Sequence, residues 1–165
     1  MKVLIISLPR TGSTSLLEKI SKDENIKNVI SEPFGFYGNP SLIDFSKPMV
    51  VKTIINQAEK GIEFYKEWSK KFDKVVLLSR KNLKECAESC SYLMYNLQFG
   101  FKHDQEYVYT QPPNYKEIES EIYKSDLDIH TLGNLLNIKV QYYEDLFDVN
   151  GPNRQRKENI FKNII

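Results

Sequence analysis

Residues 2–17 read KVLIISLPRTGSTSLL, and this stretch decides the fold. Residues 2–8 form a continuous apolar run, which is typical of a strand buried on both faces of a parallel sheet. The run stops at Pro9, and leucines then return at helical spacing within 13–22. A cation, a glycine and several hydroxyl side chains therefore lie between a predicted strand and a predicted helix.

Predicted strands and helices alternate along the rest of the chain. The strands are expected at 2–8, 26–31, 49–55, 74–79 and 138–143. The helices are expected at 13–22, 57–71, 82–98, 114–136 (one helix or a pair) and 154–164, with a long loop over 32–48. Because such alternation implies crossover connections, the sequence predicts one α/β domain over 1–165. Its expected architecture is three layers, with a five-stranded, mostly parallel sheet flanked by helices.

Length and charge limit the possible classes of protein. A chain of 165 residues fits one domain that buries a core without disulfides or metals. The net charge of +1 gives no reason to expect nucleic acid or a membrane surface as a partner. The apolar run after Lys2 is shorter than a signal-peptide core, and no stretch approaches the ~20 apolar residues of a membrane span. We therefore expect a cytoplasmic protein without a membrane span.

The cysteines and histidines offer little for disulfide or metal chemistry. Cys86 and Cys90 lie four residues apart in a predicted helix, a spacing that rarely meets disulfide geometry. With only His103 and His130, a zinc site at familiar spacings cannot be built. We expect buried or half-buried thiols and no metal site.

The loop PRTGSTS (9–15) predicts a site for an anion. Backbone N–H groups at the start of a helix point toward such a ligand, and the helix dipole favours negative charge. Gly12 allows the backbone to approach closely, and Arg10 can hold an oxyanion with its planar fork. Hydroxyl side chains follow or flank them at Thr11, Ser13, Thr14 and Ser15. Alternatively, Ser13 or Thr14 caps the helix and Gly12 merely turns the chain.

This loop is not a Walker loop. The first glycine of that pattern is missing, and no lysine follows Gly12. The strand at 74–79 is followed by Arg80, where many nucleotide hydrolases carry an aspartate that holds magnesium. The sequence therefore predicts a loop that binds an anion without a metal.

Four segments in order resemble motifs of the sulfotransferase family. The loop at 9–15 resembles its 5′-phosphosulfate loop, and SEPF (31–34) is similar to a Glu-Pro element of carbohydrate-type members. LLSRKNLKECAES (77–89) resembles the 3′-phosphate segment, and VQYYEDLF (140–147) resembles the late strand. The resemblance implies 3′-phosphoadenosine 5′-phosphosulfate (PAPS) as the donor, with no metal required. The acceptor would be the hydroxyl or amine of a small molecule or carbohydrate.

The resemblance also implies roles for the basic residues. Arg10 and the loop amides would hold the 5′ end of the donor, and Arg80 with Ser89 would hold its 3′-phosphate. Since parallel strands end at one edge of the sheet, we expect Arg10 and Arg80 to lie side by side there. The alternatives are a surface salt bridge for Arg80 and an indifferent helix position for Ser89. Two further arginines would close the site or belong to a solvated terminal helix: Arg154 and Arg156.

The candidate catalytic residues follow the predicted strands. Arg10 would stabilise charge on the leaving phosphate, and Lys52 either adds a second cation or is a surface residue with its amine in water. Glu32 is the candidate base for the acceptor, or else an ordinary loop carboxylate, and His103 is the second candidate base.

Two aromatic segments have less specific roles. The aromatic segment 96–115 is expected to form an acceptor-side wall or core, and residues 143–145 to hold the sheet edge.

Three other functions remain open at this point. An ATP-dependent small-molecule kinase with a degenerate loop would require magnesium and bind ATP. A non-catalytic nucleotide-binding relative would bind the donor product without turnover. An interaction protein, in which the loop is only a helix cap, would bind no such ligand.

Overall fold

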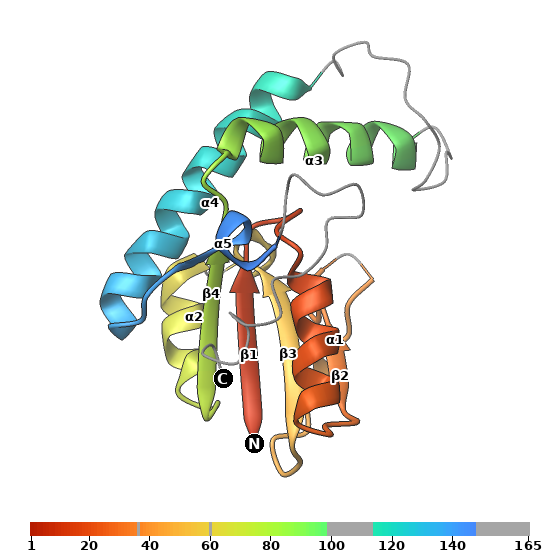
Figure 1. Cartoon of the computed structure of the whole chain (residues 1–165), viewed down its shortest axis with the longest axis vertical. Helices are drawn as coiled ribbons and strands as arrows, with labels where there is room; N and C mark the ends of the chain where they lie inside the picture. The colour runs from red at the N-terminus through yellow and green to blue at the C-terminus, as the bar shows by residue number, and fades with distance from the viewer. Residues whose placement is uncertain (36, 60, 99–113, 148–165) are drawn as a thin grey trace.

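Five parallel strands form one sheet in the order β2-β3-β1-β4-β5 (Figure 1). The computed structural model describes residues 1–35, 37–59, 61–98 and 114–147. Its strands are β1 (Lys2–Ser7), β2 (Val29–Ser31), β3 (Met49–Ile54), β4 (Lys74–Ser79) and β5 (Gln141–Tyr142). The predicted five-stranded parallel sheet flanked by helices is confirmed.

The helices and 3₁₀ turns lie between the strands in sequence or follow the last one. They are α1 (Ser13–Asp23), α2 (Gly61–Ser69), α3 (Leu83–Gln98), α4 (Tyr115–Leu136) and α5 (Tyr143–Leu146), with 3₁₀ turns η1 (Pro40–Leu42) and η2 (Ile55–Gln57). The region predicted as one helix or a pair is thus the single helix α4. The helix predicted at 57–71 begins only at Gly61, because the chain first turns through η2. The helix predicted at 154–164 lies outside the described residues.

The strands predicted at 26–31 and 138–143 both begin three residues later than expected, as β2 and β5, and for the same reason. Asn25 and Asn137 adopt positive φ at the ends of α1 and α4, and the next residues donate backward to the helices. Ile26 N donates to Ser21 O at 2.8 Å, and Ile138 N donates to Gly133 O at 2.9 Å. These bonds complete helix C-caps, so the residues after the helices cannot begin pairing with a strand at once.

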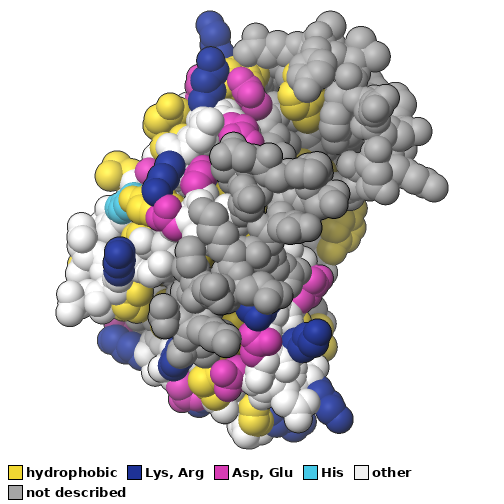
Figure 2. Space-filling model, viewed as in Figure 1, with side chains coloured by type: hydrophobic (Ala, Val, Ile, Leu, Met, Phe, Trp, Pro, Cys, Tyr) yellow, Lys and Arg dark blue, Asp and Glu magenta, His cyan; other side chains and the backbone are white. Residues whose placement is uncertain are grey.

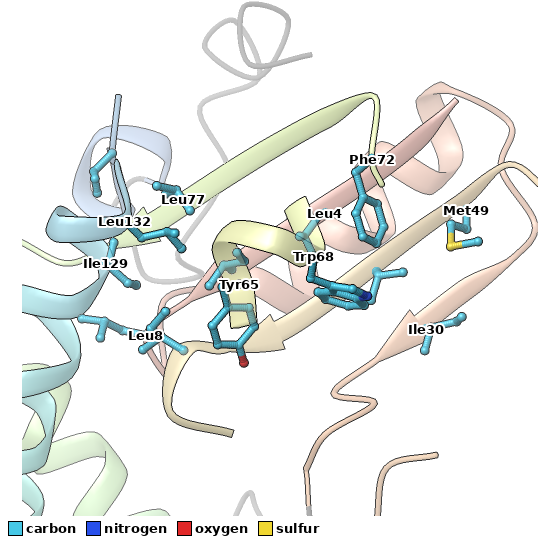
Figure 3. Packing of buried hydrophobic residues seen from close by; sticks show 14 residues of the cluster. Leu4, Leu8, Ile30, Met49, Tyr65, Trp68, Phe72, Leu77, Ile129 and Leu132 are labelled. Carbon is cyan, nitrogen blue, oxygen red and sulfur yellow. The ribbon is translucent and has the colours of Figure 1, made fainter. Parts of the chain in front are cut away.

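Side chains of the central strand alternate between two cores. Leu4 and Ile6 face a cluster that includes Tyr65 and Trp68 of α2, together with residues of α4 (Figure 3). Val3 and Ile5 face the opposite cluster, which contains residues of α1 and α5. Because successive strand residues point to opposite faces, the continuous apolar run of β1 fills both cores. The predicted three layers are therefore present.

Helix α3 has a different position from the helices that cover the sheet faces. It crosses the carboxyl ends of the strands and packs on α4 (Figure 1). Cys86 and Cys90 are free and buried in this contact, as predicted, beside Tyr115 and Ile122 of α4. The helix thus forms a roof over the edge where ligands bind in open α/β sheets.

The surface mixes charges of both signs. Figure 2 shows Lys and Arg interspersed with Asp and Glu on the face in view, together with hydrophobic side chains. Exposed apolar residues of α4 include Tyr123, Leu127 and Leu135. In the part of the chain that the structure describes, no helix has the length and apolarity needed to cross a bilayer.

Candidate functional site

A cavity of about 690 Å³ lies at the carboxyl ends of the strands, within the size range of sites for small ligands. The loop after β1 and the first turn of α1 supply half of the described lining. These residues are Pro9, Arg10, Thr11, Gly12, Ser13, Thr14 and Ser15. The remaining described lining comes from four other segments: Glu32, Lys52, Ile54, Ser89, Leu93, Tyr143 and Phe147. Strand order thus unites residues that are far apart in sequence.

Gly12 is required at the turn into α1 for two reasons. Its φ is +67°, a conformation that L side chains rarely adopt. A Cβ atom there would also lie 2.7 Å from Cε2 and 2.8 Å from Cζ of Phe147. Arg10 also has a positive φ of 57°, so the loop turns sharply around this glycine. The loop shape depends on both the local backbone and the packing of α5.

The start of α1 has no side-chain cap. Gly12 is the N-cap residue, and no side chain accepts a hydrogen bond there. The hydroxyl of Thr11 instead donates to Leu8 O at 2.8 Å inside the protein. The alternative that Ser13 or Thr14 caps the helix is therefore wrong. The first amides of α1 face a cavity, which is the arrangement that binds anions in many proteins.

Arg10 and Ser89 meet across one wall of the cavity, called here the arginine wall. Arg10 Nε donates to Ser89 Oγ at 2.9 Å, although 79 residues separate them. Both residues line the cavity, and Arg10 is exposed. Ser89 is therefore not an indifferent position of α3, because its hydroxyl orients the cation beside the loop.

Arg80 lies directly behind the same loop. Its Nη1 donates to Arg10 O at 3.3 Å, which confirms that the two arginines meet at one edge of the sheet. Arg80 is only 3% exposed, and its guanidinium stacks 4.7 Å from the ring centre of Tyr143. The alternative of a surface salt bridge is wrong. Arg80 does not line the cavity among the described residues, and its contact with a 3′-phosphate remains a prediction.

Two carboxylates compensate the buried charge of Arg80. Glu144 Oε1 lies 3.5 Å from Arg80 Nε, and Glu85 Oε1 lies 3.0 Å from Nη2 without hydrogen-bond alignment. Glu144 also accepts from the amides of Lys81 at 2.9 Å and Asn82 at 3.2 Å. Burial raises the pKa of Glu144, but these amides and Arg80 outweigh burial and lower it. Glu144 thus ties the end of β5 to the turn after β4, as predicted.

Lys52 and Glu32 form a second wall of the cavity, called here the lysine wall. Lys52 is 4% exposed, and its Nζ forms an ion pair with Glu32 Oε1. The same amine lies 3.5 Å from Thr14 Oγ1 at the start of α1. Lys52 is therefore not a surface residue, and its charge is directed into the cavity wall.

Glu32 is held in an unusual conformation. Its φ is 51°, which is rare for a residue with a side chain, and its amide donates to Lys52 O at 2.6 Å. Partial burial raises the pKa of Glu32, but hydrogen bonds from Lys52 and Gln57, with the charge of Lys52, lower it overall. Glu32 is therefore an ionised carboxylate at neutral pH and can accept a proton or a hydrogen bond.

Sequence reasoning missed part of the cavity lining. Tyr143 and Phe147 stack at 4.7 Å between ring centres and cover Gly12, although only a role in holding the sheet edge was predicted for Tyr143. Their spacing of four residues is typical of one face of a helix. A strand was expected at 138–143, so the sequence did not indicate that a helix begins at Tyr143. Leu93, on the face of α3, also lines the cavity and was not predicted, whereas Ile54 at the end of β3 belongs to the strand ends where a ligand was expected.

Some predicted site residues lie outside the described residues. These are His103, the second candidate base, Arg154 and Arg156 of the basic tail, and most of the aromatic segment at 96–115. Their predicted roles remain predictions.

No family model matches this chain, and a search of curated proteins finds no similar sequence.

Proposed function

We propose that the protein is a sulfotransferase that moves a sulfuryl group from PAPS to a hydroxyl or amine. The single observation that carries this proposal is the cavity with two unlike walls. An uncapped helix start borders the cavity, with the cation Arg10 beside it and an ionised Glu32 paired with Lys52 nearby. Anion binding and proton acceptance are the two tasks that such a transfer requires.

The arginine wall suits the donor. The amides of α1 and the guanidinium of Arg10 would hold the 5′-phosphosulfate, while Ser89 would contact the 3′-phosphate. Arg80 would reach that phosphate by giving up its ion pair with Glu85 and forming one with the phosphate. Glu85 is the more exposed of the two carboxylate partners of Arg80, at 46% against 17% for Glu144. Replacement of a solvated ion pair costs less than rupture of a buried one.

The lysine wall suits the transfer step. The acceptor oxygen or nitrogen would form a bond to sulfur as the bond from sulfur to the 5′-phosphate oxygen breaks. Glu32 would take the acceptor proton, and 3′-phosphoadenosine 5′-phosphate would leave as the second product. Charge spreads over the sulfuryl oxygens and the leaving phosphate in such transfers, where Arg10 and Lys52 would stabilise it.

One observation favours a second candidate function. Lys52 already neutralises Glu32, and the lowered pKa of this carboxyl makes it a weaker base. A protein that binds the nucleotide without turnover would retain the same arginine wall. Donor binding and product formation must therefore be measured separately.

The decisive experiment is calorimetric titration with 3′-phosphoadenosine 5′-phosphate, with ADP and AMP as controls, with and without magnesium. We expect binding that requires the 3′-phosphate and no metal. Ser89→Ala should weaken it about tenfold, since one hydrogen bond to a charged group is lost. Ser91→Ala is the matched control, because that hydroxyl is buried and donates to Ala87 O at 2.9 Å. Preference for ADP with magnesium would favour the kinase, and no binding of any nucleotide would reject the proposal.

Turnover is then tested with PAPS and a panel of sugars, phenols and amines, with formation of the bisphosphate product as the readout. Release of this product that depends on an acceptor supports the sulfotransferase. Tight binding with no release for any acceptor class favours the binding-only protein.

A further inference from the structure

Gln57 contacts the candidate base from outside the described cavity lining. It ends the 3₁₀ turn η2, and its Nε2 donates to Glu32 Oε2 at 2.7 Å. Its Oε1 accepts from the amide of Ile54 at 3.1 Å and from Thr53 Oγ1 at 3.3 Å. Lys52 contacts the other carboxylate oxygen, so each oxygen of Glu32 has its own partner.

The orientation of the Gln57 amide is set by its surroundings. The backbone amide of Ile54 can only donate, so the carbonyl oxygen of Gln57 must face it. The amino group of Gln57 then necessarily faces Glu32, which as a carboxylate can only accept. A flipped amide would place two donors together at Ile54 and two acceptors together at Glu32.

The loop after Glu32 leaves space for this amide. A Cβ atom on Gly35 would lie 2.9 Å from Gln57 Nε2 and 3.3 Å from Glu32 O. The amide of Gly35 donates to that same carbonyl at 3.0 Å. A glycine therefore allows the turn containing Glu32 to close directly over the Gln57 side chain.

Buried hydroxyls anchor the other side of Gln57. Tyr65 OH donates to Ile54 O at 2.8 Å and lies 3.2 Å from Thr53 Oγ1. Burial raises the pKa of Tyr65 to about 12, so this hydroxyl stays protonated over the working pH range. Gln57 is thereby fixed to the end of β3 and, through Tyr65, to helix α2.

We propose that Gln57 is a positioning residue that holds the carboxylate of Glu32 toward the acceptor. This inference depends on the proposed function, in which Glu32 takes the acceptor proton. Among the described residues, the charged group that contacts Glu32 is Lys52 of β3, and Arg10 of the loop before α1 lines the same cavity. Gln57 itself is neutral, so it orients the carboxylate without cancelling the charge that accepts the proton.

The test compares Gln57→Leu and Gly35→Ala with the parent full-length chain. Leucine removes the hydrogen bond, and alanine displaces the amide of Gln57 while leaving that residue in place. Asn56→Leu is the matched control, because this exposed amide is in the same turn and approaches Glu121 at 3.5 Å instead. Circular dichroism and thermal unfolding identify any variant that fails to fold.

Two readouts separate positioning from a merely structural role. The first is the titration of the Glu32 carboxyl by ¹³C NMR, assigned with Glu32→Gln, which needs no turnover. The second is the acid limb of the pH profile of kcat/KM with PAPS and an active acceptor. In both variants we expect the NMR titration of the Glu32 carboxyl and the acid limb of the kcat/KM profile to move to higher pH, because a hydrogen bond to the ionised carboxylate is lost. Turnover should fall about tenfold with KM for PAPS unchanged, since the base is misplaced.

The outcomes are distinguishable. If Glu32 titrates at the parental pH in both variants, Gln57 does not hold it and the inference is wrong. If the titration moves but no acceptor is ever sulfated, the contact is real and the proposed transfer fails. If the Asn56→Leu control moves Glu32 equally, the effect belongs to the turn and not to Gln57, which also overturns the inference.

Discussion

The arginine wall and the lysine wall of the cavity each place one cation beside the start of α1, but the two cations are held differently. Arg10 is exposed, and its partner is the neutral hydroxyl of Ser89. Lys52 is buried and pairs with the carboxylate of Glu32. Among the described residues, no carboxylate forms an ion pair with Arg10, so its full charge is available to a bound anion.

This difference assigns separate work to the two walls. A cation with a neutral partner raises the affinity for an anion, because it loses no other ion pair when the anion binds. A buried cation paired with a carboxylate mainly keeps that carboxylate ionised and in place. The arginine wall is therefore expected to control anion binding and the lysine wall to control stability, which under the proposed function correspond to donor binding and to support of the acceptor step.

The largest expected effect comes from Gly12→Ala, which disrupts the turn into α1 at the cavity. The change forces a side chain into positive φ and against Phe147, so we expect a loss of stability of about 2–4 kcal/mol. Urea unfolding measures this loss. Gly61→Ala is the control, since Gly61 also has positive φ but no neighbour within 4 Å of the added atom. Equal losses in the two variants would show that contact with Phe147 contributes nothing.

The next effect separates the walls by comparing Arg10→Ala with Lys52→Met. Arg10→Ala should weaken binding of 3′-phosphoadenosine 5′-phosphate about 10- to 100-fold with stability unchanged, because one charge-assisted contact is lost. Lys52→Met should cost on the order of 1–2 kcal/mol of stability, a value reduced for solvent screening because Glu32 is 36% exposed. Calorimetry and urea unfolding of both variants measure the two quantities. The reverse pattern would contradict the division between the walls.

The smallest effect is the dependence of stability on pH. The pKa values of Glu32 and Glu144 are lowered in the folded protein, so both carboxylates stabilise the fold when ionised. This contribution is complete above the ordinary glutamate value of 4.5 and is lost as the pH falls through the lowered folded values. Urea unfolding between pH 7 and 3 should show the decline. Glu144→Gln should flatten it, and an unchanged slope in that variant would remove Glu144 from the explanation.

Local sequence predicted the elements that depend on short-range pattern. The β4 strand at 74–79 was predicted to the residue, and β1 and α1 to within one residue, because apolar runs and helical spacing are local signals. The strand predicted at 138–143 covers only Gln141–Tyr142. Ile138 belongs to the C-cap of α4, and Tyr143 is already the first residue of α5. Such competition between a cap and a strand is decided by tertiary packing.

The residues after each strand were predicted to lie at the ligand-binding edge, because parallel strands bring their carboxyl ends to one edge of the sheet. Gln57 and Phe147 were not predicted to act there, and for Tyr143 only a structural role at the sheet edge was expected. Their contacts with Glu32 and Gly12 join residues 25 or more positions apart, and no spacing in the sequence reports such contacts.

The sequence by itself determined the alternating strands and helices, and it determined that a cation and a glycine would precede the first helix. Buried apolar runs, helical periodicity and turn residues act over a few neighbours, so they can be read directly. Only the tertiary structure decided that Arg10 keeps a neutral partner while Lys52 pairs with a carboxylate. Electrostatic pairing depends on distances between side chains from different strands, and these distances exist only once the sheet has assembled.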